Sequence, residues 1–509
     1  MTPKSTTDSE VPRGAAAVPA DQPDRARQPG AVAALGTAAV YSLGFAVQRA
    51  LGIALLPFYT RALTPTEYGT LGVLLSVSAA ATTIFSAALD TSITRNYFQL
   101  AETPERRGEY ISSIWRFLVI YPTMGALVFS AITMPFVSGV PTVGPLEILL
   151  TFIAASLTAT ATTLPLNVLR ARRDLRGYLL VTGTLTIATP ALTALFVIAL
   201  DESVKGWFIA AAISNALAFV VAARVVPWQP GVKINWTLVR AALLFSAPLM
   251  PHLLSAWALQ LADRLILTGL VSGSQLGVYS LASTLAAPLL MLVMALNGAF
   301  LPTYAAAGAQ AATSDELRRT VTMQIAATAA LTLACALLGA DAARALAGPG
   351  YSGASSLVPW IVLGYGFLGC YFVPMNGATL GAGRRKFAWV ATASSATTNV
   401  LLILIFVPSY GIYAAAVASA VGYLVLLVSM SLWAHRGDNP VEYDWFRLTA
   451  IVGAALVTYT AASVTKPGGI GGAVLVDACW LMVFGAATLV LGFPNQGRKL
   501  IGRAIAAAR

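Results

Sequence analysis

Residues 259–282, LQLADRLILTGLVSGSQLGVYSLA, place an adjacent acid and base inside one apolar run, and a short turn then leads into a second apolar run. A helix needs about 20 mainly apolar residues to cross the hydrocarbon core of a bilayer. The turn has an earlier counterpart, because LTPTEYGTLGV at 63–73 aligns with VSGSQLGVYSL at 271–281 and sets Gly69 on Gly277. The stretch therefore predicts two membrane-spanning helices joined by a tight turn, within a chain that repeats.

The composition of the whole chain excludes a soluble fold. Of its 509 residues, 57% are hydrophobic and 10% are charged, and the mean hydropathy is +0.74. Soluble domains carry about a quarter charged residues. The formal net charge of +11 does not indicate a nucleic-acid partner, because the Lys and Arg residues fall in short loops between apolar runs.

Apolar runs of spanning length predict an all-α integral membrane protein of about 14 transmembrane helices. An even number of spans places both termini on one side of the membrane. The expected spans are 34–60, 67–93, 111–135, 146–168, 178–200, 205–225, 242–269, 276–301, 321–341, 355–379, 388–408, 411–433, 447–465 and 472–492.

The distribution of basic residues predicts the orientation. Of the 32 Lys and Arg residues, 25 fall in the tails and loops on the side of the N-terminus, four fall on the opposite side and three lie within spans. Loops rich in Lys and Arg remain cytosolic. We therefore expect a multi-pass protein of the cell membrane with both termini in the cytosol.

The repeat predicts two equivalent six-helix lobes around a central cavity, followed by two further helices. The basic loop LRARRDL from Leu169 has a counterpart in LGAGRRKF from Leu380, each between the fourth and fifth helix of its half. Parallel repeats place substrate sites between the halves and permit alternating access. The expected organisation is a disordered cytosolic tail (1–32), a first lobe (33–226), a cytosolic linker (227–240), a second lobe (241–435), two extra spans (436–497) and a basic cytosolic tail (498–509).

With its Asp-Arg pair, short outer loop and Gly-x-Tyr opening the next helix, the stretch 259–282 resembles the polysaccharide (O-antigen type) flippases. Residues 58–74, FYTRALTPTEYGTLGVL, and 404–423, LIFVPSYGIYAAAVASAVGY, resemble the same family. Its superfamily also contains lipid II flippases and multidrug and toxin extrusion transporters. The resemblance covers nearly the whole chain after the N-terminal tail, and it implies two six-helix lobes around a central cavity.

Arg49 is the strongest candidate for substrate binding. An Arg at the centre of a span costs about 2.5 to 3.5 kcal/mol on insertion scales, so its presence calls for an explanation. Its planar fork of donors matches a phosphate or an acidic sugar, and Arg264 is the second such candidate. The alternative for Arg49 is an ion pair that fixes packing. Three amides are candidate sugar-binding groups, although such residues more often join helices: Gln48, Gln260 and Asn297.

Three charged residues are candidates for coupling or gating: Asp263, Asp90 and Arg95. Asp263 and Arg264 are adjacent, and neighbouring helical residues point about 100° apart, so we expect each to find a partner elsewhere. The family resemblance implies that at least one of them faces the central cavity, and the alternative places both at the outer interface as helix-end anchors. Asp90 and Arg95 are expected to form a cytosolic gate or a snorkelling interfacial pair.

His252 follows Pro248 and Pro251, which should bend the helix beside a cavity. Its imidazole is a candidate for proton coupling, and a hydrogen-bonded packing residue is the alternative. Asp341 and Asp477 lie near the outer ends of spans, where we expect them to be solvated.

No metal site, disulfide, cofactor or catalytic group is expected. The three cysteines lie inside apolar stretches (Cys335, Cys370 and Cys479). No Walker A sequence occurs, which argues against ATP hydrolysis by this chain. The basic clusters at 170–176 and 384–386 are explained by topology, and the same charge gives them a secondary role in attracting anionic lipid head groups.

The expected function is secondary transport: flipping of a polyprenyl-phosphate-linked oligosaccharide to the outer leaflet for cell-surface polysaccharide synthesis. Expected partners are this substrate, membrane lipids and a polysaccharide polymerase or glycosyltransferase. Rival interpretations are a drug or organic-cation exporter and a lipid II-type flippase. A membrane glycosyltransferase or polymerase is a further rival, but it would need larger outer loops than the sequence provides.

Overall fold

The computed structural model describes residues 47, 50–100, 103–137, 143–229, 231–308, 314–348, 350–381, 388–436, 443–467 and 469–492, and every regular element in these ranges is helical. Gln48 and Arg49, the tails at 1–32 and 498–509, and the basic cluster at 384–386 lie outside the described residues.

The helices follow the expected spans closely, so the prediction of an all-α membrane protein is confirmed. Within the described ranges, 12 helices are long and apolar enough to cross a membrane. The first half contains α2 (Leu56–Ala62), α3 (Pro65–Phe85), α4 (Leu89–Gln99), α5 (Pro104–Val137), α6 (Pro145–Ala171), α7 (Leu175–Thr193) with a π-helical end (Ala194–Ala199), and α8 (Ser203–Val225). The second half and the extra pair contain α9 (Trp236–Ser246), α10 (Met250–Leu267), α11 (Gly273–Gly308), α12 (Ser314–Leu346), α13 (Ala354–Asn376), α14 (Ala388–His435), α15 (Trp445–Thr465) and α16 (Ile470–Gly492).

One of the 12 helices, α14, contains two of the expected spans. Gly411 within it has φ 64° and ψ −155°, which is not helical. Glycine adopts positive φ without the steric cost of a Cβ atom. The chain therefore changes direction here, and the two parts of α14 correspond to the spans predicted at 388–408 and 411–433.

Repeat-equivalent residues begin the second helix of each half. At the start of α3, Thr64 Oγ1 accepts a hydrogen bond from Glu67 N at 3.3 Å, and the Glu67 carboxylate accepts one from Thr64 N at 2.8 Å. At the start of α11, Ser272 and Gln275 make the same reciprocal pair at 3.3 Å. Such capping boxes satisfy backbone donors that have no partner within the helix. The repeat seen in the sequence is thus a repeat of local structure.

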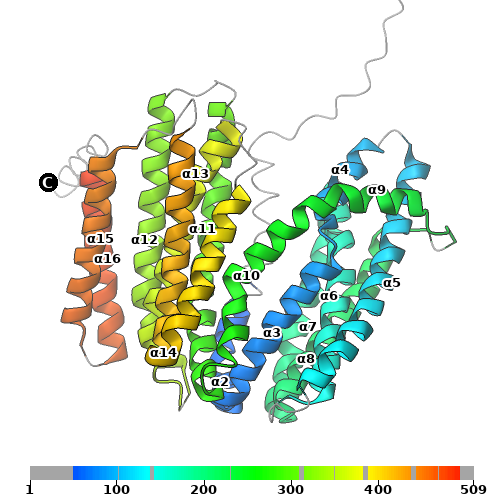
Figure 1. The fold of residues 1–509 in the computed structure, drawn as a ribbon, viewed down its shortest axis with the longest axis horizontal. Helices are drawn as coiled ribbons and strands as arrows, with labels where there is room; N and C mark the ends of the chain where they lie inside the picture. Colours follow the sequence, from blue (N-terminus) through cyan, green and yellow to red (C-terminus); the bar gives the residue numbers. More distant parts are fainter. Residues whose placement is uncertain are drawn as a thin grey trace, which may run out of the picture. The chain divides into compact units, whose positions relative to one another are not determined.

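The helices of each half pack mainly on one another (Figure 1). In the first half, α6 packs against α5, α8 and α3, and α7 packs against α8. In the second half, α13 packs between α12 and α14, and α11 contacts both α12 and α13. The extra pair, α15 and α16, packs on α12. The two halves meet chiefly where α3 of the first half packs on α11 and α10 of the second.

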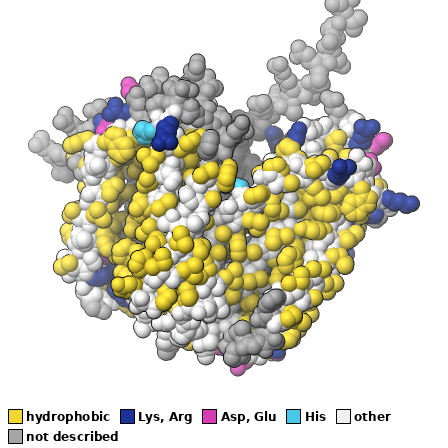
Figure 2. Space-filling view, in the orientation of Figure 1, with side chains coloured by type: hydrophobic (Ala, Val, Ile, Leu, Met, Phe, Trp, Pro, Cys, Tyr) yellow, Lys and Arg dark blue, Asp and Glu magenta, His cyan; other side chains and the backbone are white. Residues whose placement is uncertain are grey.

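The outward-facing side chains match a lipid environment. Figure 2 shows a broad hydrophobic band over the helices, with most of the visible Lys and Arg side chains beyond its upper edge, the side on which α4 and α9 lie. Large apolar side chains are exposed on this surface, among them Ile187 at 72% and Ile405 at 62%. Exposed apolar area on this scale is typical of a membrane-spanning protein.

Two helices that join the halves are broken. The second span is interrupted between α3 and α4, where Ala87 and Ala88 have φ of 50° and 54°. The seventh is interrupted between α9 and α10 by a 3₁₀ turn at Ala247–Leu249. As predicted from Pro248 and Pro251, the helix changes geometry at this point, because proline removes a backbone donor.

The segment between the halves is fastened to α5. Gln229 N donates to Ser112 Oγ at 2.8 Å, and Asn235 N donates to Ser113 Oγ at 3.0 Å. The amide of Asn235 also donates to Glu109 Oε1 at 2.8 Å. Beyond this segment, α9 packs on α4 and α5, whereas α10 packs on α14 and α3. The break at 247–249 therefore separates a part bound to the first half from a part bound largely to the second.

Candidate functional site

A cavity of about 490 Å³ lies where the first half meets α10. Four helices line it. The lining residues are Ala79, Thr82 and Thr83 from α3, Ser86 from the turn after α3, Asp90 from α4, Thr162, Thr163, Leu166, Asn167 and Arg170 from α6, and Leu253, Ala256, Trp257, Gln260 and Leu261 from α10. On α10 the spacing is i, i+3, i+4, i+7 and i+8, which is one continuous face of a helix.

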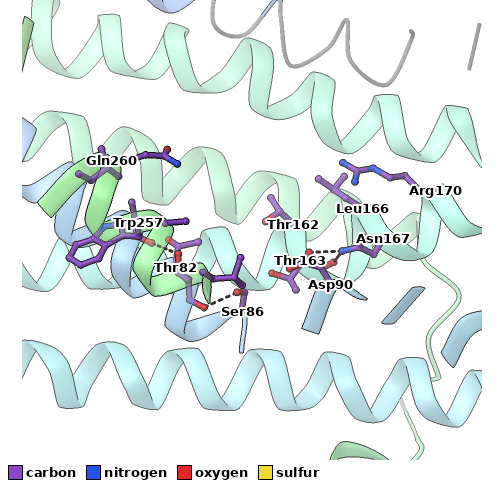
Figure 3. A pocket seen from close by; sticks show the side chains of 15 residues that line it. Thr82, Ser86, Asp90, Thr162, Thr163, Leu166, Asn167, Arg170, Trp257 and Gln260 are labelled. Atoms are coloured by element: carbon purple, nitrogen blue, oxygen red, sulfur yellow. Dashed lines mark hydrogen bonds between the residues drawn. The ribbon is translucent and has the colours of Figure 1, made fainter. Parts of the chain in front are cut away.

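Charged groups stand at one end of this cavity. Figure 3 shows Asp90, Asn167 and Arg170 near one another, away from Trp257 and Gln260. Asn167 Nδ2 donates to Asp90 Oδ1 at 2.7 Å and thereby holds the carboxylate against α6. Among the described residues that line the cavity, Arg170 is the one cation and Asp90 the one anion. The charge of the lining is therefore balanced.

The middle of the cavity is lined with hydroxyl groups whose protons are already engaged. Four of them donate to backbone carbonyl oxygens of their own helix at 2.7 to 2.9 Å. These are Thr82, Thr83, Ser86 and Thr162. A hydroxyl that has donated its proton still has lone pairs with which to accept. Towards the cavity these groups therefore act as acceptors.

The other end of the cavity has an aromatic ring and an amide. Trp257 Nε1 donates to the carbonyl oxygen of Ser76 at 3.0 Å, which fixes the indole against α3. Gln260 lies one helical turn further along the same face of α10. In the part of the chain that the structure describes, the Gln260 amide makes no hydrogen bond and remains available to a ligand.

The predicted coupling pair lies outside the cavity lining, in a buried polar cluster. The carboxylate of Asp263 accepts a hydrogen bond from Tyr279 Oη of α11, and Tyr279 also contacts Ser419 Oγ of α14 at 3.4 Å. Asn399 Nδ2 donates to the same Ser419 oxygen at 3.4 Å. Asp263 and Arg264 are 7% and 9% exposed, so neither is a solvent-exposed anchor, although Arg264 lies in the last turn of α10.

The two charges of this pair are closer than the sequence suggested. Arg264 Nη1 lies 4.0 Å from Asp263 Oδ1, although successive helical side chains diverge. Asp263 has the separate partner that we expected, Tyr279, but the expectation that the two charges do not approach each other is wrong, because the long Arg264 side chain folds back towards its neighbour. In the described residues, Arg264 Nη1 makes no hydrogen bond.

The remaining predicted residues are dispersed. Asn297 Oδ1 accepts from Asn376 Nδ2 at 2.7 Å, which joins α11 to α13 and matches the interhelical alternative. His252 is exposed in the first turn of α10. The Arg95 guanidinium lies 4.4 Å from the centre of the Phe245 ring, so it is separate from the Asp90–Asn167 contact. Of the described predicted residues, the cavity brings together Asp90 and Gln260.

Two carboxylates expected to be solvated are buried. Asp341 is 3% exposed and Asp477 is 0% exposed. Lys466 Nζ bridges them, at 2.8 Å from Asp341 Oδ1 and 2.7 Å from Asp477 Oδ2. The expectation was wrong because the turn between α15 and α16 brings Lys466 against α12, and a charge is buried only when it is paired.

Apart from Asp90 and Gln260, the residues that line the cavity were not predicted as site residues, and three of them are important for its chemistry. Arg170 was attributed to membrane topology, and Asn167 and Trp257 were not singled out. The contact between Asn167 and Asp90 spans 77 residues, so no local pattern shows it. Trp257 had a detectable signal, because it lies three residues before Gln260, on the same helical face as that candidate.

No group of three or more His, Cys, Asp or Glu side chains is placed to hold a metal ion within the described ranges. No curated protein sequence matches the chain.

Three solved structures share the fold at low sequence identity. The first, "Lipid II flippase MurJ, inward closed conformation", has a TM-score of 0.71 at 12% identity and covers 91% of this chain and 99% of its own. An inward-facing multidrug resistance MATE family transporter has a TM-score of 0.55 at 14% identity, covering 76% and 93%. A MOP superfamily transporter from Pyrococcus furiosus has 0.56 at 13% identity, covering 78% and 94%.

The fold, which these solved structures share, is that of an all-helical, multi-pass membrane protein. The sequence profile of the polysaccharide biosynthesis protein family matches residues 58–344, which is more than half of the chain. The chain belongs to that family, and the resemblance noted in the sequence is confirmed.

Proposed function

We propose that this protein flips a polyprenyl-phosphate-linked oligosaccharide from the inner to the outer leaflet of the cell membrane, by alternating access and for surface polysaccharide synthesis. The observation that carries the proposal is the cavity between α3, α4, α6 and α10, lined by hydroxyls, amides, one guanidinium and an indole. Such a lining suits a hydroxylated head group with a phosphate. Family membership in polysaccharide biosynthesis supports the same substrate class.

The charge balance of the cavity favours this substrate over an organic cation. A cation exporter would need a lining dominated by carboxylates, and the one carboxylate in the described lining, Asp90, is engaged by Asn167. Arg170 is exposed to the cavity and offers a phosphate several donors. Arg49 remains a proposed phosphate ligand from the first span.

Alternating access would use the two broken helices. The α9 end of the seventh span is bound to the first half, and α10 is bound largely to the second, so rotation at Ala247–Leu249 would tilt one half against the other. At the other end of the junction, α3 packs tightly on α11. In this proposal the cavity opens on the side where α6 ends, and with that side cytosolic, as the basic loops predict, the proposed state faces inward.

Coupling is assigned to Asp263. Its carboxylate is buried and contacts α11 through Tyr279, and Tyr279 contacts α14. Binding or release of a cation or proton at this carboxylate would change the packing of three helices of the second half, including the helix that lines the cavity. A cation gradient or the membrane potential would then drive the cycle.

The proposal is tested with purified protein in proteoliposomes that contain a fluorescent lipid-linked oligosaccharide. The fraction of probe accessible to an impermeant quencher should rise with time only when protein is present. Arg49→Ala and Arg170→Gln should slow this inversion. Efflux of organic cations that depends on Asp263 and not on Arg49, without lipid inversion, would support the exporter instead. Chemical turnover of the lipid-linked sugar would support an enzyme.

A further inference from the structure

We infer that the cavity recognises its substrate through two separate subsites: Arg170 binds the phosphate, and Trp257 with the hydroxyl-lined wall binds the uncharged sugar. This inference rests on the proposed function and assigns its recognition to particular residues. The two groups stand at opposite ends of the cavity (Figure 3).

Arg170 is held in place by one aromatic side chain. Its Nη2 donates to Tyr178 Oη at 3.1 Å, and its guanidinium carbon lies 5.3 Å from the centre of the same ring. Tyr178 is 2% exposed and provides a rigid support. Arginine carries five N–H donors, so this contact leaves donors free. Within the described residues no carboxylate forms an ion pair with Arg170, and its charge is available to an anion.

The position of Arg170 matches the depth of a lipid phosphate. It is the second-last residue of α6, the helix that spans from Pro145 to Ala171. A cation at the end of a span lies at the level of the lipid head groups. A phosphate attached to a polyprenyl chain is held at that depth because its tail stays in the hydrocarbon. The guanidinium therefore meets the phosphate without drawing the tail into the cavity.

The rest of the head group would extend along the cavity towards Trp257. Thr162 precedes Arg170 by eight residues on α6, or about 12 Å at 1.5 Å per residue, which is long enough for a sugar chain. Along this path the engaged hydroxyls of Thr82, Thr83 and Ser86 present acceptors, and sugar hydroxyls are donors. The fixed indole offers a flat apolar surface to the C–H face of a sugar ring.

The test measures binding of two probes to the full-length protein in nanodiscs. One probe is a polyprenyl pyrophosphate, and the other carries a neutral oligosaccharide on the same pyrophosphate. Arg170→Gln should weaken both by about tenfold or more, since a charge-assisted contact is lost. Arg170→Lys should recover part of this affinity. Trp257→Leu should weaken only the sugar-bearing probe, and Trp257→Phe should retain most of the affinity for it.

Arg172→Gln is the matched control, because Arg172 belongs to the same basic cluster and is exposed but does not line the cavity. Equal loss in Arg172→Gln and Arg170→Gln would show a general surface-charge effect and overturn the phosphate subsite. Equal loss of both probes in Trp257→Leu would overturn the sugar subsite. If the parent protein binds both probes and every substitution leaves binding unchanged, the two subsites are refuted but the proposed function is not. If the parent protein binds neither probe, the proposed function is refuted as well.

Discussion

Gly69 and Gly277, which the internal repeat sets at equivalent positions, each lie against the backbone of the opposite half. A Cβ atom at Gly69 would lie 2.6 Å from the carbonyl oxygen of Gly273, and one at Gly277 would overlap the carbonyl oxygen of Pro65. Pro65 and Gly273 are themselves equivalent in the repeat, so the contact is reciprocal. The two halves therefore contact each other through equivalent surfaces, at the ends where α3 and α11 begin.

Gly277→Ala should prevent this close contact. The added methyl group meets backbone atoms that cannot rotate away, and overpacking of this kind costs about 1 to 3 kcal/mol. We expect loss of transport and a shift towards the outward-open state. The shift is measured as faster labelling of Gln260→Cys by an impermeant maleimide from outside.

Gly298→Ala is the control for this substitution, because Gly298 also lies on α11 but a Cβ atom there meets nothing within 4 Å. It should leave transport and labelling unchanged. Normal transport in Gly277→Ala would show that the glycine contact is not required for the cycle.

A disulfide between Thr66→Cys and Gly273→Cys should prevent α3 and α11 from separating where the two helices begin. A Cβ atom at Gly273 would lie 3.5 Å from Thr66 Cβ, which is within the usual range of about 3.5 to 4.5 Å for a disulfide. In a background with alanine in place of the native cysteines (Cys335, Cys370 and Cys479), oxidation should stop transport and a reductant should restore it.

Each single-cysteine variant should be insensitive to oxidant. Continued transport by protein shown by mass spectrometry to be cross-linked would mean that opening of this end is not part of the cycle.

The parts of the fold that were predictable depend on local chemistry. Span length and loop charge can be read from single continuous segments of the sequence. The Thr64–Glu67 capping box and the matching Ser272–Gln275 pair, which we did not predict, are also local, because each joins residues three apart. The repeat also aligns the two halves with each other, residue by residue. It could not show that equivalent glycines face each other, because that contact depends on how the halves pack.

The site was less predictable because its contacts join distant segments. Charge inside a span drew attention to Asp263, yet its hydrogen-bond donor, Tyr279, belongs to the next helix. The excess of Lys and Arg in the cytosolic loops was enough to explain Arg170 by membrane topology. A positive charge at the inner end of a span can also bind a substrate phosphate, so the sequence does not distinguish a topological role of Arg170 from a binding role.

Asp263→Asn should abolish the coupling of lipid inversion to a cation gradient. Asparagine keeps the size and the ability to accept a hydrogen bond from Tyr279, but it has no negative charge to attract a cation or proton. Inversion of the lipid-linked probe in proteoliposomes should be faster with an imposed cation gradient for the parent protein. The variant should show the same low rate with and without that gradient.

Tyr279→Phe tests whether coupling needs only the charge of Asp263 or also the hydrogen bond that positions its carboxylate. It removes the hydrogen bond and leaves the carboxylate, so gradient dependence should weaken without disappearing. A full response to the gradient in Asp263→Asn would remove this carboxylate from the coupling mechanism.

Lys466→Met should destabilise the attachment of α15 and α16 to α12. The substitution removes the ammonium group that pairs with both Asp341 and Asp477, at 2.8 and 2.7 Å. Breaking a buried ion pair costs about 3 to 5 kcal/mol, because a charge is left without its partner. We therefore expect a marked fall in the midpoint of thermal unfolding in detergent.

Arg344→Gln provides the contrast. Arg344 Nη1 also pairs with Asp341, at 3.0 Å, but its side chain is 51% exposed, and such pairs contribute about 0 to 1 kcal/mol. The midpoint should scarcely change. Adding Asp341→Asn and Asp477→Asn to Lys466→Met should recover much of the lost stability, because both stranded charges are then neutral. If Lys466→Met unfolds at the temperature of the parent protein, the buried cluster does not hold the extra helices in place.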